Sequence, residues 1–97
     1  MHPFQAKLGV WNARKAPHLV AVEPWGSDYT LLPDEKLEVI AFGKAAVPWF
    51  NVVEWDGNTQ VYCEDTTTFK VVLGDRELKC GHQRQVAPTA AADGGGG

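Results

Sequence analysis

Cysteine and histidine are the residues in this chain that could carry nucleophilic or metal chemistry. Cys80 and His82 stand two residues apart, and His18 is a third candidate ligand. Zinc sites usually repeat a Cys-x-x-Cys step, which the chain lacks. A nucleophilic thiol needs partial exposure beside a positive group, whereas Cys63 and Cys80 fall on the apolar side of predicted strands. The sequence therefore favours buried thiols over a disulfide, cysteine catalysis, or a metal site at His18, Cys80 and His82.

Acidic pairs and glycines give no catalytic pattern either. Asp34-Glu35 and Glu64-Asp65 both lie in predicted turns, where acidic side chains commonly bond to backbone N–H groups. Glycines occur at turns and near the C-terminus, and never as a phosphate-binding loop ahead of a helix. With 12 acidic and 9 basic residues, the formal net charge of −3 excludes the basic footprint of a nucleic-acid or anionic-membrane binder. We predict no catalytic residues and no cofactor.

Aromatic side chains are the most unusual feature of the chain, with 4 Trp, 2 Tyr and 4 Phe among 97 residues. Exposed rings of this kind stack on sugars or bury against proteins. The predicted ligand or partner face consists of Trp25, Tyr29, Trp49, Val53, Trp55 and Tyr62. Trp25 has a second interpretation, as a lid over the core. Which of these rings face solvent depends on the elements that carry them.

The strongest local signal is a hairpin that joins Phe50–Trp55 to Thr59–Glu64 through Asp56-Gly57, a dipeptide that favours a type I′ turn. Side chains alternate along each strand, so the hairpin has two sides of different composition. The predicted core side carries Phe50, Val52, Val61 and Cys63, and the other side carries Trp49, Val53, Trp55, Gln60 and Tyr62. This second side either lies under another sheet or faces a partner.

A second hairpin is predicted from 69–73 to 76–80 around Gly74-Asp75, with glycine first as a type II′ turn prefers. Its two-residue loop pairs Leu73 with Arg76, Val71 with Leu78 and Phe69 with Cys80, which collects the apolar side chains on one face. Further strands are expected at 18–22 and 37–42, with a brief edge strand at 30–32. For the first 17 residues we prefer an irregular arm over another strand.

These segments predict an all-β fold: a small antiparallel β-sandwich or partly open barrel, jelly-roll-like, with about six short strands. We divide the chain into an N-terminal arm over 1–17, a β-sandwich domain over 18–85 and a disordered tail over 86–97, which has no large apolar residue after Val86. The chain lacks an 18-residue apolar run and the apolar region of a signal peptide, so a cytoplasmic location is predicted.

Residues 22–42 carry the phrases EPWG, YTLLPDE and LEVIAF. Over about 21 residues this stretch resembles small bacterial β-sandwich proteins of no assigned function, and more broadly jelly-roll and cupin-like folds. A cupin resemblance implies a metal held by two closely spaced histidines, a glutamate and a later histidine. This chain has only His2, His18 and His82, without a His-x-His pair, so the cupin ligand set is not transferred to these positions.

The sequence therefore predicts a non-catalytic binding or assembly module that works through its aromatic face. The expected partner is another protein or a second copy of the chain, because a two-fold contact needs only one self-complementary patch. Nucleic acid and membrane are not expected partners, and a small molecule or a sugar is the alternative ligand. The alternatives are a cupin-like metal-binding protein or enzyme around His18, Cys80 and His82, and a carbohydrate-binding module.

Overall fold

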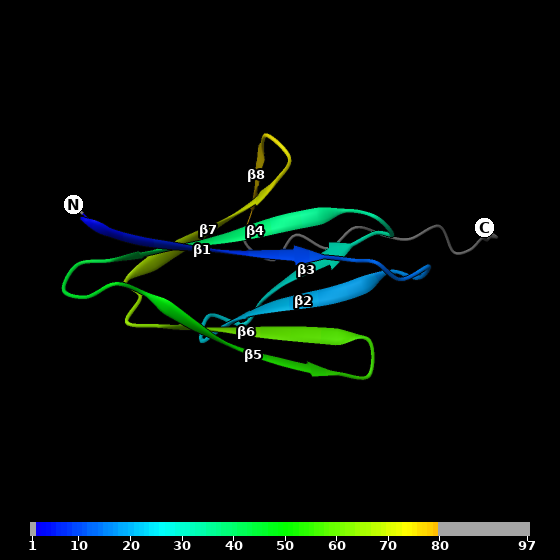
Figure 1. Cartoon of the computed structure of the whole chain (residues 1–97), viewed down its shortest axis with the longest axis horizontal. Coiled ribbons are helices and arrows are strands. Elements are labelled where there is room, and N and C mark those ends of the chain that lie inside the picture. The colour runs from blue at the N-terminus through cyan, green and yellow to red at the C-terminus, as the bar shows by residue number, and fades with distance from the viewer. Residues whose placement is uncertain (1, 80–97) are drawn as a thin grey trace.

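The structure, a computed structural model, describes residues 2–79. Every regular element in that range is a β-strand, and the strands form two four-stranded sheets that lie face to face (Figure 1). The strands are β1 (Phe4–Trp11), β2 (His18–Glu23), β3 (Ser27–Leu31), β4 (Lys36–Gly43), β5 (Trp49–Trp55), β6 (Asn58–Glu64), β7 (Thr68–Leu73) and β8 (Arg76–Leu78). The predicted all-β sandwich is confirmed, with eight strands where about six were expected.

One sheet has the order β1-β4-β7-β8 and is antiparallel throughout; we call it sheet A. The other, sheet B, has the order β3-β2-β6-β5, and its central pair β2 and β6 runs parallel. The expectation of a purely antiparallel fold is therefore wrong for sheet B. The chain visits sheet A with β4 between β2 and β6, and this return through the opposite sheet is the crossover that a parallel pair requires.

The N-terminal segment is a strand, so the preference for an irregular arm over residues 1–17 is wrong for Phe4–Trp11. Strand β1 pairs with β4 from Phe4 opposite Gly43 to Trp11 opposite Lys36. Its residues alternate between half-buried and exposed, which is the pattern of an edge strand with one face toward a core. The half-buried side chains are Phe4, Ala6, Leu8 and Val10. Burial of that apolar row explains why the segment pairs with β4 instead of lying loose.

Both predicted hairpin turns are confirmed. Asp56 and Gly57 take positive φ angles of 43° and 82°, as a type I′ turn requires, and Trp55 pairs with Asn58. In the second hairpin Gly74 has a φ of 64°, and Leu73 pairs with Arg76. Val71 and Leu78 face each other and are buried, as the two-residue loop predicts. The predicted partnership of Phe69 with Cys80 lies outside the described residues.

The core lies between the sheets and consists mainly of β-branched and leucine side chains with one aromatic residue. It contains Val20, Val22, Tyr29, Leu31, Leu37, Val39, Val61, Cys63, Val71 and Leu78. Tyr29 is only 1% exposed, so its predicted place on the partner face is wrong. Strand β3 carries Ser27, Tyr29 and Leu31 on its inward side, opposite β2, and this parity turns the tyrosine into the core.

The predicted tail over 86–97 and the last part of the predicted domain, residues 80–85, lie outside the described residues. Within residues 2–79, no helix is long and apolar enough to cross a membrane.

Candidate binding face

The outward side of the β5–β6 hairpin is an exposed aromatic surface. Trp49, Val53, Trp55 and Tyr62 share this side, and we call these four residues the aromatic face. Their exposed fractions are 51%, 44%, 53% and 37%, respectively. On the inward side of the same hairpin, Val61 is fully buried and Cys63 is 7% exposed. Strand parity thus separates the two sides as predicted, but the placement of Val52 in the core is wrong: it points inward and is still 46% exposed, because it lies on the edge strand β5.

Two hydrogen bonds hold the indole rings of the aromatic face. Trp49 Nε1 donates to Asp65 Oδ2 at 3.0 Å, and Trp55 Nε1 donates to Gln60 Oε1 at 3.2 Å. Asp65 sits in a turn with a positive φ of 52°, and the backbone at Gly43 packs so closely against it that a Cβ there would lie 2.9 Å from the Asp65 carbonyl oxygen. With their polar edges satisfied, both rings offer their faces for stacking.

The outward side of sheet B carries acidic residues and no lysine or arginine. Strand pairing places Glu23 beside Tyr62 and Asp28 beside Ala21 on this side, and Glu64 beside Trp49. Asn51 Nδ2 donates to Glu64 Oε2 at 3.1 Å, so amide and carboxylate groups lie among the rings. The outward side of sheet A differs: parity places Lys7, Lys36 and Lys70 there. The aromatic face therefore has a negative local potential.

Trp25 does not extend the aromatic face. Its ring lies 4.5 Å from the ring of Phe69, centroid to centroid, and Phe69 packs against the core from sheet A. Trp25 is 40% exposed, so its ring is partly open to solvent while it contacts Phe69. Of the predicted face residues between 22 and 42, Tyr29 is therefore a core residue, and the contact of Trp25 with Phe69 favours its second interpretation, as a lid over the core. Trp11, which was not predicted as exposed, is 62% exposed on the outward side of sheet A.

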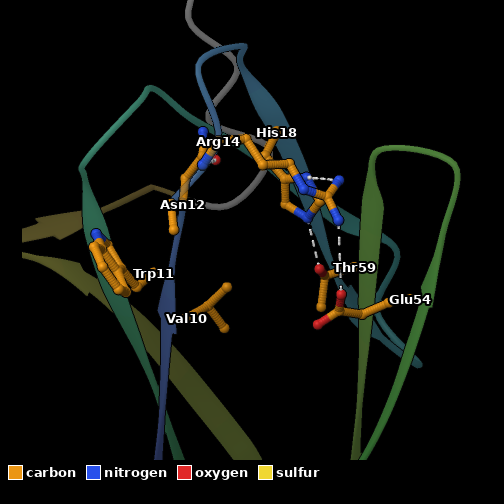
Figure 2. A pocket seen from close by; sticks show the side chains of 8 residues that line it. Val10, Trp11, Asn12, Arg14, His18, Glu54 and Thr59 are labelled. Atoms are coloured by element: carbon orange, nitrogen blue, oxygen red, sulfur yellow. Dashed lines mark hydrogen bonds and ion pairs between the residues drawn. The ribbon is translucent and has the colours of Figure 1, made fainter.

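Apart from the aromatic face, a cluster of polar side chains lines a pocket of about 160 Å³ (Figure 2). His18 and Thr59 are buried there and approach to 2.7 Å between Nε2 and Oγ1. Arg14 lies 3.4 Å from His18 Nδ1 and 4.0 Å from a Glu54 carboxylate oxygen, measured from its two terminal nitrogens. Asn12 closes the same pocket from the β1–β2 connection.

The direction of the hydrogen bonds in this pocket excludes a mechanism in which His18 takes a proton from a Thr59 nucleophile. A guanidinium group only donates, so His18 Nδ1 accepts from Arg14 and the imidazole proton sits on Nε2. His18 therefore donates to Thr59 and cannot take its proton. In a catalytic triad a carboxylate holds the Nδ1 side, whereas here a cation does. The pocket is a structural contact between β2 and β6.

Burial lowers the pKa of His18, and the adjacent Arg14 charge lowers it further, while Glu54 acts in the opposite direction. A group with a depressed folded-state pKa binds more protons in the unfolded chain, so the free energy of unfolding must fall as the pH drops below the ordinary value of 6.5. The loss should continue until the folded-state pKa is reached. We expect urea unfolding between pH 7.5 and 5 to show this decline.

The control for the pH prediction is His18→Gln, which keeps a hydrogen-bond donor near Thr59 but does not titrate. Its stability should decline less than that of the wild-type chain over the same interval. An equal decline in both proteins would assign the pH dependence to other groups.

Cys63 is a free, buried thiol, as predicted. Burial raises its pKa to about 11, and the neighbouring Glu64 charge adds to this effect. The thiol is therefore protonated at neutral pH and is a poor nucleophile. Of the three metal candidates, Cys80 and His82 lie outside the described residues, and both ring nitrogens of His18 are engaged by Arg14 and Thr59. Across residues 2–79, no group of three or more His, Cys, Asp or Glu could hold a metal ion.

No protein-family model matches the chain, and comparisons with curated proteins and with solved structures also gave no match. The resemblance based on residues 22–42 stays a prediction. Strand alternation in the sequence already indicates the pocket residues, because His18 shares parity with Val20 and Val22, and Thr59 shares parity with Val61. Alternation along β2 and β6 therefore directs both polar side chains inward.

Proposed function

We propose that this chain is a non-catalytic binding module whose contact surface is the aromatic face, and that its partner is a protein segment with apolar and cationic side chains. The observation that carries the proposal is the exposure of Trp49, Val53, Trp55 and Tyr62 together on one side of one hairpin. Tryptophan and tyrosine dominate the energetics of protein contacts. Grouped large apolar side chains on the surface of a small domain mark interaction sites.

Charge narrows the chemistry of the partner. The outward side of sheet B combines indole rings with Glu23, Glu64 and the Asp65 carboxylate. Its four described strands carry no lysine or arginine on that side, and Lys44 lies beyond the strands, in a pocket that Asp65 also lines. Lysine and arginine side chains stack on tryptophan faces and pair with carboxylates, so a basic, partly apolar segment satisfies both features at once. An acidic partner would meet like charge. We also propose a cytoplasmic location, as predicted from the sequence.

A carbohydrate is the second candidate, favoured by the fixed orientation of the indoles. The bonds from Trp49 to Asp65 and from Trp55 to Gln60 hold two flat rings whose neighbours are amides and carboxylates. Sugar rings stack on such surfaces and donate hydroxyl protons to such acceptors. A cupin-like metal site is not proposed, because both ring nitrogens of His18 are occupied by other contacts.

The test is a selection from a random-peptide display library on the immobilised full chain, followed by affinity measurements. We expect the enriched peptides to combine Lys or Arg with apolar residues. Trp55→Ala should weaken their binding by at least about tenfold, since truncation of an aromatic anchor at an interface commonly costs about 2 kcal/mol. The matched control is Trp11→Ala, which removes a tryptophan of similar exposure, 62% against 53%, from the opposite sheet.

Binding that Trp55→Ala and Trp11→Ala weaken equally would contradict the proposal, and so would a selection without enrichment. The carbohydrate candidate is tested in parallel by following tryptophan fluorescence during titration with soluble oligosaccharides. A fluorescence change that Trp55→Ala abolishes and Trp11→Ala preserves would replace the peptide partner with a sugar.

A further inference from the structure

The four edge strands of the sandwich differ in how they are protected from pairing with another chain. Exposed edges in soluble proteins are normally short or carry lysine, proline or other charges. Strand β8 spans only three residues, including Arg76 and Glu77, and β3 spans five with Asp28. Strand β1 presents Lys7 at its middle. Strand β5 reads WFNVVEW, with seven residues, no lysine, arginine or proline, and Glu54 as its single charge.

Strand β5 is also poorly covered. It is the last strand of sheet B, at the lower border of the molecule in Figure 1, and in the described part of the chain it pairs only with β6. Six of its seven residues are exposed. Val52 points to the inward side and Val53 to the outward side, yet they are 46% and 44% exposed. In natural proteins an edge strand with exposed apolar side chains on both faces is typically covered by another chain. Strand β5 has the properties of such a strand.

The hairpin turn fixes which backbone groups of β5 are free. In a two-residue turn the flanking residues Trp55 and Asn58 exchange hydrogen bonds, and such pairs alternate along an antiparallel ladder. Odd-numbered residues of β5 therefore direct their N–H and C=O groups toward β6. Phe50, Val52 and Glu54 direct theirs away from it, so three donors and three acceptors line the open edge.

We propose that a second copy of this chain pairs with β5 through this open edge, as an antiparallel two-fold dimer centred on Val52. Hydrogen-bonded pairing across the open edge requires even-numbered residues to face even-numbered residues, which a two-fold axis through any single residue of β5 allows. An axis at Glu54 would place two carboxylates opposite each other. An axis at Phe50 would pair Val52 with Pro48 of the other copy, and proline has no N–H to donate. Only the Val52 centre uses all seven residues and pairs Phe50 with Glu54 of the other copy, without like charges opposite each other.

The dimer joins the two copies of sheet B into one continuous eight-stranded sheet. Its seam places Trp49 of one copy opposite Trp55 of the other in the closely spaced, non-hydrogen-bonded pairs, twice by symmetry. The aromatic face of each copy thus becomes half of a composite surface. Face-to-face association, in contrast, would bring the carboxylates of two acidic surfaces together. The edge dimer does not require a ligand, so it goes beyond the proposed binding function.

Sedimentation velocity on the full chain tests the proposal directly. A seam of one strand per copy is small, so we expect a dimer with a dissociation constant on the order of 10 µM. Val52→Lys puts two lysines opposite each other on the two-fold axis and should weaken the dimer at least about tenfold. The matched variant Val53→Lys changes a neighbour of nearly equal exposure that points outward and faces Asn51 of the other copy. It should leave the dimer intact.

A cross-link reports the register independently of variant stability. With the native cysteines replaced by Cys63→Ala and Cys80→Ser, Val52→Cys should form an intermolecular disulfide in a glutathione redox buffer, because paired residues lie roughly 5.5 Å apart between Cα atoms. Val53→Cys should not, since its symmetry mate lies two residues along the seam. A chain that stays monomeric at its highest soluble concentration, or a dimer that Val53→Lys breaks and Val52→Lys spares, would overturn the proposal.

The same two variants separate this inference from the proposed function. Val53→Lys alters the aromatic face and should impair peptide binding while preserving the dimer, and Val52→Lys should do the reverse. Loss of peptide binding alone leaves the dimer supported, and loss of the dimer alone leaves the binding face supported.

Discussion

Replacing Tyr29 with alanine is expected to lower the free energy of unfolding by about 3–5 kcal/mol, the range for truncating a large aromatic core residue. The side chain is 1% exposed and packs among the valines and leucines between the sheets. Its removal leaves a cavity that the surrounding β-strands cannot fill, because both sheets are held by their ladders. Urea unfolding followed by tryptophan fluorescence measures the change.

The matched control is the other tyrosine of the chain. Tyr62→Ala removes the same side chain from the aromatic face, where it is 37% exposed, and should cost no more than about 1 kcal/mol. Similar losses in the two variants would mean that the hairpin's outward side is covered, and the binding face would then be wrong. Tyr29→Ala retaining wild-type stability would contradict the placement of β3 in the core.

Asn12→Asp is expected to destabilise the fold by about 3 kcal/mol at neutral pH, because it buries an unpaired charge against carbonyl oxygens. Asn12 is 2% exposed, and its Nδ2 donates to the carbonyls of Ala16 and Leu31 at 2.9 Å each. Its Oδ1 accepts from the Arg14 N–H at 3.0 Å. One side chain therefore ties the β1–β2 connection to strand β3. A carboxylate can accept but cannot donate, so both carbonyls would lose their partner.

The pH dependence of this variant distinguishes the mechanism from a general loss of packing. Burial beside carbonyl oxygens raises the folded-state pKa of an aspartate at position 12 above its unfolded value, so its penalty is present at neutral pH and shrinks as the pH falls. Asn51→Asp is the control, because Asn51 is exposed and its Nδ2 donates to the half-buried Glu64 carboxylate. Two carboxylates in contact with water repel only weakly, so the variant should cost below about 1 kcal/mol. A penalty at position 12 that does not shrink on acidification would contradict the hydrogen-bond assignment.

Much of the hairpin geometry was readable in advance from the residues alone. Asp56-Gly57 and Gly74 adopt the positive φ angles that their residue types favour. Each turn fixes the pairing register of its two strands, and this register does not depend on residues far away in the sequence. Alternation then separates Trp55 and Tyr62 from Val61 and Cys63. These predictions succeeded because turn conformation and side-chain alternation depend on residues only a few positions apart.

Three features were decided only by the assembled sheets. The parallel pairing of β2 with β6, the pairing of β1 with β4, and the contact of His18 with Thr59, 41 residues apart in sequence, each join distant segments. The sequence predicts Tyr29 on the partner face, yet pairing with β2 turns it inward. Short-range preferences specify each hairpin and its two sides. Which of those sides is then buried depends on the apolar surface that other strands leave uncovered, and only the packed sandwich determines this.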